Sequence, residues 1–416
     1  MFKKKTMGKL ALIIMSASVL LLQGCGGKDD LTGYDGNAGT SVEQMIQDKL
    51  SGMAGAEGDN EEAFTDNAGE IKTAKERLAE MTLEEKVYQM FIVTPEALTG
   101  YDVVNASTEI TKGWLEKYPV GGLVYFADNI MTREQTEDML KNTTASAIEL
   151  QGMPIFLCVD EEGGRVVRVA GNDKMGVTNV GPMKDIKDKD EANKAGTTVG
   201  TYLKELGFTV DMAPVADVLT NDKNTVIGDR SFGSDAAIVD EYADSYSDGL
   251  HSQGMLSVYK HFPGHGATEG DTHEGYAFTN KTYEELKAAE LVPFANAQKN
   301  KIDMVMVAHI AVPNITGDNT PCTLSYKMVT EILRNDLGYD GLIITDAMNM
   351  GAITKNYSSK DATVKAIQAG VDIILMPQDF SEAVAGVLEA VENGEISEER
   401  INESVLRIIQ KKMKMK

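Results

Sequence analysis

The chain has 416 residues, of which 42% are hydrophobic and 25% are charged, so it is long enough to bury a large core. Its formal net charge is −24 at pH 7, and a surface this acidic repels phosphate backbones. We therefore expect no nucleic acid among its partners.

The first 25 residues have the features of a bacterial export signal. Four lysines fall among the first nine residues, and an apolar stretch follows from Leu10 to Leu22. That stretch is too short to span a bilayer comfortably. It ends in Leu-Gln-Gly-Cys25, which resembles the lipobox of bacterial lipoproteins. The resemblance implies a signal peptide over residues 1–24 and a lipid on Cys25; an ordinary signal peptide or an N-terminal membrane anchor are the alternatives.

Residues 25–68 are rich in Gly, Asp, Glu, Ala and Ser, with few large apolar side chains and no sustained periodicity. This composition predicts a flexible acidic tether. We expect residues 69–416 to form a single catalytic domain, placed by the lipid at the extracytoplasmic side of the cell membrane.

The pattern changes at the start of that domain, where Thr82-Leu-Glu-Glu85 has the spacing of a helix capping box. Eight short apolar runs follow, at residues 89–93, 122–126, 155–160, 209–213, 256–261, 304–309, 342–346 and 373–377. Segments with helical periodicity lie between or after them, at 133–150, 190–206, 238–253, 283–299, 326–336, 361–369 and 397–413. Alternating strands and helices predict an α/β fold with a parallel sheet, and eight repeats favour a (β/α)8 TIM-type barrel over an open doubly wound sheet.

Polar, reactive residues recur at or just after the ends of five of these runs. They are Asp160, Asp217, Lys260 with His261, His309 and Asp346. In a barrel all strand C-termini open on one face, where active sites are built. The pattern therefore predicts that these residues share one pocket.

Three of the five histidines, His261, His265 and His273, fall within thirteen residues. The Pro-Gly pair at 263–264 prevents a helix there, so the segment is a strand that runs into a shaped loop. The histidines could order the loop, bind a metal or catalyse proton transfer. No helical His-x-x-x-His pair is present, which argues against a metal. Asp271 stands two residues before His273, and a hydrogen bond between them would raise the histidine pKa and suit acid/base catalysis.

Three further blocks carry candidate site residues. Asp346 ends an apolar strand, where cations and backbone donors would keep it ionised as a nucleophile. Asp160 opens a block with two glycines and two arginines, of which Arg168 offers forked donors and Arg165 is the structural one. Arg230 lies in a separate loop, within Asp-Arg-Ser-Phe-Gly.

Together these blocks resemble glycoside hydrolase family 3, and its β-N-acetylhexosaminidase branch in particular, over about residues 75–380. The matching motifs are KHFPGHG at 260–266 with D-x-H at 271–273, DEEGGRVVR at 160–168, DRSFG at 229–233, TDAMNM at 345–350 and MTLEEKVYQM at 81–90.

The resemblance implies a retaining double displacement on terminal N-acetyl-β-hexosamine. It assigns Asp346 as nucleophile and His273, polarised by Asp271, as acid and then base. It also implies that five residues bind the sugar: Asp160, Arg168, Arg230, Lys260 and His261. The pairing departs from the usual two-carboxylate scheme of glycosidases.

The expected substrates are peptidoglycan-derived fragments, with no metal or other cofactor, and the other partner is the membrane. An N-acetylglucosaminide phosphorylase, a family 3 β-glucosidase and a catalytically inactive sugar-binding lipoprotein remain as alternatives. The sequence leaves open whether Cys158 and Cys322 pair. Because the chain ends about 40 residues after its eighth run, we expect a barrel without the second domain that the family often carries.

Overall fold

The structure is a computed structural model that describes residues 63–65, 71–268 and 277–415. The chain divides into two units, Met1–Asn60 and Glu61–Lys416, and only the second contains described residues. The predicted signal peptide, Cys25 and most of the predicted tether therefore lie outside the described residues. Within the described ranges, no helix is both long enough and apolar enough to cross a bilayer.

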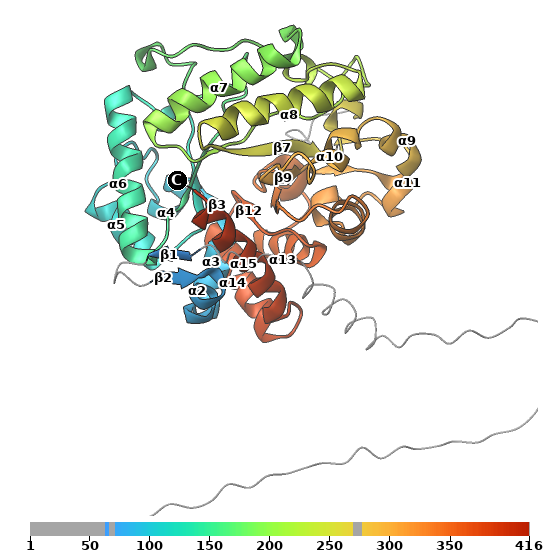
Figure 1. Cartoon of the computed structure of the whole chain (residues 1–416). Coiled ribbons are helices and arrows are strands. Elements are labelled where there is room, and N and C mark those ends of the chain that lie inside the picture. Colours follow the sequence, from blue (N-terminus) through green and yellow to red (C-terminus); the bar gives the residue numbers. More distant parts are fainter. Residues whose placement is uncertain (1–62, 66–70, 269–276, 416) are drawn as a thin grey trace, which may run out of the picture. The chain divides into compact units, whose positions relative to one another are not determined.

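The core of the second unit is a barrel of eight parallel strands (Figure 1). In chain order they are β3 (Phe91–Val93), β4 (Gly122–Val124), β5 (Phe156–Val159), β6 (Val210–Asp211), β7 (Leu256–Phe262), β9 (Met304–Val307), β11 (Leu342–Thr345) and β12 (Ile374–Leu375). Each pairs in parallel with the next, and β12 pairs with β3. A parallel bridge between Ile344 and Ile373 joins β11 to the start of β12, which closes the ring. Each strand falls in one of the eight predicted runs, with β7 extending one residue beyond its run, so the predicted barrel is confirmed.

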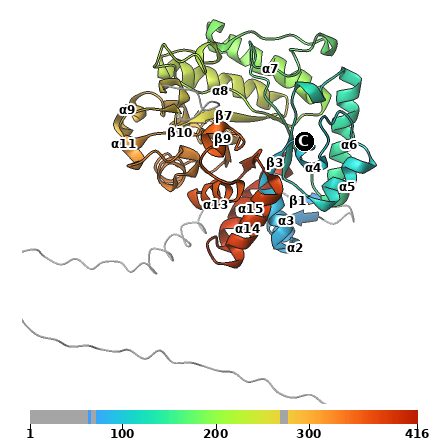
Figure 2. The same ribbon diagram turned by 180° about the vertical axis from the view of Figure 1, so that it is seen from behind.

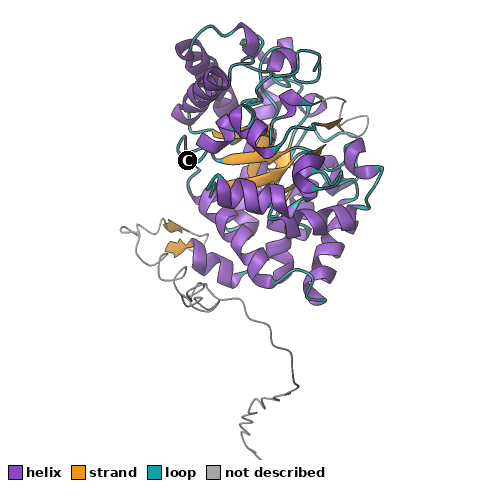
Figure 3. Ribbon diagram, turned by 90° about the vertical axis from the view of Figure 1, so that its right-hand side faces the viewer, coloured by secondary structure: helices purple, strands orange, loops and turns teal. Residues whose placement is uncertain are grey.

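Helices surround these strands, as the views from behind and from the side show (Figures 2 and 3). They are α2 (Ala74–Glu80), α3 (Leu83–Gln89), α4 (Pro95–Thr99), α5 (Glu109–Lys117), α6 (Arg133–Gln151), α7 (Lys189–Leu206), α8 (Ala236–Ser252), α9 (Tyr283–Ala288), α10 (Val292–Asn296), α11 (Pro313–Thr316), the π-helical segment η8 (Lys327–Asp336), α12 (Gly351–Thr354), α13 (Ser359–Ala369), α14 (Phe380–Glu392) and α15 (Glu398–Met413). Short 3-10 turns occur in the loops at η2 (Ala127–Asn129), η3 (Asp173–Met175), η4 (Met183–Asp185), η5 (Gly228–Arg230), η6 (His265–Ala267) and η7 (Cys322–Leu324).

Local sequence signals explain several helix boundaries. The Thr82 hydroxyl accepts from the amide of Glu85 while the Glu85 carboxylate accepts from the amide of Thr82, which is the predicted capping box. The helix expected over 283–299 is wrong as a single element, because it breaks into α9 and α10. Pro293 lies in the first turn of α10 and cannot donate the hydrogen bond that a continuous helix requires.

Two short sheets and several helices, of which α5 and α14 are the longest, were not predicted. Strands β1 (Ala63–Thr65) and β2 (Ile71–Thr73) form an antiparallel pair, and β8 (Ala277–Phe278) pairs in parallel with β10 (Ile310–Ala311). Helix α14 precedes the last helix. Two- and three-residue strands carry too little periodicity to be seen in a sequence.

The barrel strands are buried throughout, as expected for a parallel sheet covered by helices. Helices α7 and α8 lie side by side on the outside (Figure 1). Gly196 and Gly249 stand at their crossing, where an added Cβ would lie 2.0 Å from the Tyr246 carbonyl oxygen or 2.3 Å from that of Asn193. Only glycine permits this close approach of the two helices, which follow the loops after β5 and β6.

Candidate active site

A cavity of about 330 Å³ lies at the C-terminal ends of the barrel strands. It is lined by all six of the predicted site residues that the structure describes: Asp160, Arg168, Arg230, Lys260, His261 and Asp346. These residues come from the ends of β5, β7 and β11 and from the loops after β5 and β6. Of the strand-end residues predicted to share one pocket, Asp160, Lys260, His261 and Asp346 line it together with Arg168 and Arg230, whereas Asp217 and His309 do not.

Lys260, on β7, is the centre of a buried charge network. Its side chain is 2% exposed, and its Nζ lies 2.8 Å from Asp160 Oδ1 and 2.6 Å from Glu162 Oε1. Arg230 donates to the same Glu162 carboxylate through Nε at 2.7 Å and through a terminal nitrogen at 2.8 Å. This two-point contact fixes the orientation of the guanidinium group. The network keeps both cations at the cavity wall.

The charges of this network reinforce one another. Burial alone would raise the pKa of Glu162, but Arg230 and Lys260 hold it well below its usual value. Burial would likewise lower the pKa of Lys260, but Asp160 and Glu162 raise it above its usual value. Glu162, Lys260 and Arg230 are therefore ionised at neutral pH, and a polar ligand meets fixed charges that need no reorganisation.

His261 is oriented from behind by Asp217, which follows β6. Its Nδ1 lies 2.7 Å from Asp217 Oδ2, and its Nε2 lies 3.4 Å from a terminal nitrogen of Arg230. The other oxygen of Asp217 accepts the backbone amides of His261 and His265 at 3.2 and 2.6 Å. Burial raises the pKa of Asp217, but His261 and His265 reverse this and hold it below its usual value. Asp217 therefore fixes both the ring and the backbone at the end of β7.

Arg168 lies over the ring of Phe126, with its guanidinium carbon 5.6 Å from the ring centroid. One terminal nitrogen is 3.9 Å from Asp160 Oδ2. Its Nε is buried and has no hydrogen-bond acceptor among the described residues. A buried donor without an acceptor is costly, so this arginine suits the binding of a polar ligand.

Asp346 follows β11 and lines the cavity. Its amide donates to the Val307 carbonyl at 2.9 Å, and its Oδ1 accepts the Ala347 amide at 2.8 Å. Burial alone would raise its pKa, but His309, His261, the Ala347 amide and Lys260 together hold it below its usual value. The site therefore contains a partly buried carboxylate that is ionised and lines the cavity, as a nucleophile requires.

Sequence reasoning missed two carboxylates of the Asp160-Glu-Glu162 run. Glu162 binds two predicted cations, and Glu161 accepts the backbone amides of Arg168, Val169 and Ala170 at 2.7–2.8 Å. Glu161 is fully buried and thereby shapes the loop that presents Arg168. Three consecutive acidic residues at the end of an apolar strand were the available signal.

Asp271 and His273 lie outside the described residues, so their predicted roles are not tested. Their segment lies between Thr268 and Ala277, and both of these ends are fixed at the barrel mouth. The Thr268 carbonyl accepts from the Asn221 side chain at 2.9 Å, and Ala277 pairs with Ile310 just after β9. Arg165, the structural arginine of the prediction, does not line the cavity but binds Asp229 at 2.9 Å.

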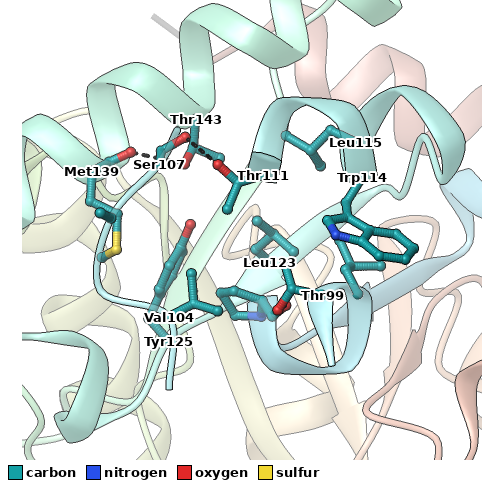
Figure 4. A pocket seen from close by; sticks show the side chains of 13 residues that line it. Thr99, Val104, Ser107, Thr111, Trp114, Leu115, Leu123, Tyr125, Met139 and Thr143 are labelled. Carbon is teal, nitrogen blue, oxygen red and sulfur yellow. Dashed lines mark hydrogen bonds between the residues drawn. The ribbon is translucent and has the colours of Figure 1, made fainter. Parts of the chain in front are cut away.

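Another cavity lies outside the barrel, between β4 and helices α4, α5 and α6 (Figure 4). Its volume of about 20 Å³ holds about one water molecule, and Trp114, Leu115, Leu123 and Tyr125 make its lining largely apolar. It is too small for a sugar. Cys158 and Cys322 are both buried free thiols, so they do not pair. No cluster of potential metal ligands occurs within the described parts of the chain.

Comparison with known proteins agrees with this geometry. The glycosyl hydrolase family 3 N-terminal domain matches residues 82–411. Over 325 residues the chain is 31% identical to beta-hexosaminidase A of Pseudoalteromonas piscicida, covering 72% of this chain and 54% of that protein. It is 34% identical to beta-hexosaminidase LpqI of Mycobacterium tuberculosis, covering 74% of this chain and 78% of that protein.

Among solved structures, a glycoside hydrolase family 3 beta-N-acetylglucosaminidase from Paenibacillus sp. superposes with a TM-score of 0.75 at 33% identity. The superposition covers 80% of this chain and 63% of that protein. The chain thus spans about half to four fifths of the length of these relatives, and the matched part contains the whole barrel.

Proposed function

Since the chain belongs to glycosyl hydrolase family 3, we propose that it is a retaining β-N-acetylhexosaminidase that releases terminal N-acetyl-β-hexosamine. The observation that carries the proposal is the partly buried, ionised carboxylate of Asp346, which faces a cavity lined by Lys260, Arg230 and Arg168. A sugar has many hydroxyls and no net charge, and a wall of fixed donors and acceptors suits it.

In this mechanism the reaction proceeds by double displacement. An oxygen of Asp346 attacks the anomeric carbon while the glycosidic C–O bond breaks and His273 gives a proton to the leaving oxygen. Water then attacks the same carbon, His273 takes its proton, and the bond to Asp346 breaks. Asp271 holds the tautomer of His273 and stabilises its protonated form.

The remaining residues bind and orient the sugar. Asp160 accepts from hydroxyl groups, and Lys260, Arg168, Arg230 and His261 present donors to the ring substituents. The N-acetylhexosamine specificity rests on the relatives, which are named beta-hexosaminidases and a beta-N-acetylglucosaminidase. Peptidoglycan-derived fragments are the proposed natural substrates, because an exported enzyme meets the cell wall.

Export itself is part of the proposal. The basic start, the apolar stretch and the Leu-Gln-Gly-Cys25 sequence support removal of residues 1–24 and lipid attachment at Cys25. Metabolic labelling with a tritiated or alkynyl fatty acid tests this step. Label that persists in Cys25→Ser would contradict it.

The test of function compares the purified enzyme on the nitrophenyl β-glycosides of N-acetylglucosamine and of glucose. We expect activity on the first substrate, and loss of about 10⁴-fold or more in Asp346→Asn, which keeps the size of the side chain but not its charge. Preference for the glucoside would favour a β-glucosidase. Release of sugar 1-phosphate in phosphate buffer would favour a phosphorylase. Full activity of Asp346→Asn would refute the assigned nucleophile.

A further inference from the structure

His309 lies two residues beyond the end of β9 and has no part in the mechanism above. Its side chain is completely buried at the barrel mouth. Both of its ring nitrogens have oxygen atoms within hydrogen-bond distance, so its protonation state can be deduced from which of those oxygens are able to donate.

The first nitrogen, Nε2, lies 3.0 Å from the carbonyl oxygen of Ala347. A carbonyl oxygen has no proton to give and can only accept. Nε2 therefore carries a hydrogen. Ala347 is also the residue whose amide donates to Asp346 Oδ1 at 2.8 Å, so one residue connects the imidazole to the proposed nucleophile.

The second nitrogen, Nδ1, lies 2.8 Å from the hydroxyl oxygen of Thr323, on η7. That hydroxyl also lies 2.8 Å from the Ala308 carbonyl oxygen and 3.0 Å from that of Val307. A hydroxyl has one hydrogen and two lone pairs. Two carbonyl oxygens this close require that hydrogen, because an oxygen pair at 2.8 Å without a bridging hydrogen is repulsive. The lone pair left for Nδ1 then accepts a hydrogen from the ring.

We propose that His309 is held as a doubly protonated imidazolium beside Asp346, and that its positive charge stabilises the Asp346 carboxylate as nucleophile and as leaving group. The proposal rests on the proposed role of Asp346. His309 is a positioning residue in this scheme, since it acts on the sugar only through that carboxylate.

The surrounding charges are compatible with a cation at this position. Among the described residues, the charged or titratable groups near the adjoining strand ends include Asp346 after β11, and Lys260 and His261 on β7. Next to Thr323, burial raises the pKa of the Cys322 thiol, so it stays neutral. Asp346 is an anion whose charge can favour a cationic His309. Of the groups that hold the pKa of Asp346 below its usual value against burial, His309 is the strongest.

The charge has its main consequence in the second half of the reaction. When Asp346 is bonded to the anomeric carbon its negative charge is gone, and the buried imidazolium has lost the attraction of that carboxylate. Breaking that bond returns the electron pair to the carboxylate and restores the ion pair. The imidazolium therefore favours release of the sugar to water, and a neutral side chain at this position slows that step.

Nitrogen NMR of the ring-labelled enzyme tests the protonation state directly. The sequence has only five histidines, so the signals of His309 are assigned by their disappearance in His309→Gln. We expect both ring nitrogens at the protonated position across pH 6–9. A signal from one deprotonated ring nitrogen at pH 7 would overturn the proposal.

Thr323 offers a matched pair of variants, because its side chain is fully buried and does not line the cavity. Thr323→Val removes the hydroxyl that accepts from Nδ1, and we expect His309 to become neutral at pH 7. Thr323→Ser keeps the hydroxyl and should keep the imidazolium signature. Thermal unfolding of both variants shows whether each is folded. A neutral ring in Thr323→Ser, or an unchanged cation in Thr323→Val, would contradict the hydrogen-bond assignment.

Kinetics then test what the charge does. With an activated aryl N-acetyl-β-glucosaminide, Thr323→Val should give a pre-steady-state burst of aryl alcohol and a kcat about 10- to 100-fold lower, whereas Thr323→Ser should resemble the unsubstituted enzyme. The acidic limb of kcat/KM should move to higher pH in Thr323→Val, since Asp346 loses its cation. Equal kcat and equal acidic limbs in the two variants would refute the catalytic part.

These outcomes separate this proposal from the proposed function. A neutral His309 in an active hexosaminidase refutes only the imidazolium. Full activity of Asp346→Asn refutes the nucleophile assignment, whatever the state of His309.

Discussion

The barrel buries a lysine at each of its ends, and the two lysines are held in opposite ways. At the mouth, Lys260 lies between two carboxylates, Asp160 and Glu162. At the opposite end, Lys412 of α15 is fully buried, donates to Gln89 Oε1 at 2.7 Å and lies 5.3 Å from the ring centroid of Phe156.

The difference between them appears in their titration. Neighbouring carboxylates raise the pKa of Lys260 in spite of burial, whereas burial, assisted by Arg77, lowers the pKa of Lys412 to about 7. Burial alone therefore does not decide whether a lysine is charged. The partners decide it, and carboxylate partners are present at the end where a substrate requires fixed charge. Substitutions at the mouth should therefore lower activity or remove stabilising charge pairs. Substitutions at the opposite end of the barrel, around Lys412, should change stability alone.

The largest effect is expected for the proposed acid/base. His273→Ala should lower kcat/KM by about 10²–10⁴ on a nitrophenyl substrate, and by less on a dinitrophenyl substrate whose leaving group needs no proton. Asp271→Ala should shift the alkaline limb of kcat/KM. Equal losses on both substrates, with an unchanged alkaline limb, would exclude His273 as the acid.

The mouth network is tested by Glu162→Gln, which leaves Lys260 and Arg230 without their shared anion. We expect a loss of about 3–5 kcal/mol in the free energy of unfolding at pH 7, measured with urea. Because the folded-state pKa of Glu162 is held below its unfolded value, this contribution is present above pH 4–5 and disappears as the pH falls through the folded pKa.

The matched control for that variant is Glu137→Gln, which removes an exposed ion pair with Arg133 on α6 at 3.2 Å. An exposed pair of this kind contributes about 0.5 kcal/mol or less. Similar losses from both substitutions would show that the buried network does not stabilise the mouth.

At the opposite end of the barrel, removing a buried charge should stabilise the protein instead of destabilising it. Lys412→Met should raise the free energy of unfolding by roughly 2–4 kcal/mol at pH 6 without changing kcat, because a neutral chain of similar length replaces an amine that burial disfavours when charged. The folded pKa of about 7 lies below the unfolded value, so the native chain loses stability as the pH falls from about 10 to 7. The advantage of methionine should therefore shrink above pH 7.

Lys411→Met is the adjacent control, because Lys411 is partly exposed and binds Asp303 at 2.8 Å. We expect a small loss of stability there, about 1 kcal/mol. If Lys412→Met lowers the free energy of unfolding as Lys411→Met does, the Lys412 amine stabilises the folded protein, and the proposed cost of its burial is wrong.

The smallest expected effects distinguish Arg168 from Arg165, the two arginines of the block at residues 160–168. Arg168→Ala should raise KM about 10- to 100-fold, since a charged hydrogen bond to a ligand contributes about 1.5–3 kcal/mol. Arg165→Ala should change KM less than about threefold, because that side chain is half exposed and binds only the loop at Thr225–Asp229. Equal changes would place both side chains in contact with substrate.

The sequence predicted the barrel well for a physical reason. Strands buried on both faces must be continuous apolar runs, and all eight runs contain an observed strand. It failed where elements were short or interrupted, at the pair β8 and β10 and at the break near Pro293 between α9 and α10, and it also missed the 13-residue helix α14. The predicted boundary between tether and catalytic domain, at residue 69, remains a prediction, and the compact unit begins at Glu61.

By itself the sequence predicted which residues gather at the mouth of the barrel, because the C-terminal ends of parallel strands open on one face. Only the tertiary structure decided how they are partnered. That Glu162 holds both Arg230 and Lys260, that Asp217 orients His261, and that Thr323 lies against His309 depends on strands far apart in the chain meeting at one mouth. A partner's charge acts over a few ångströms in space. Because these partners are far apart in the chain, the sequence around each residue does not reveal them.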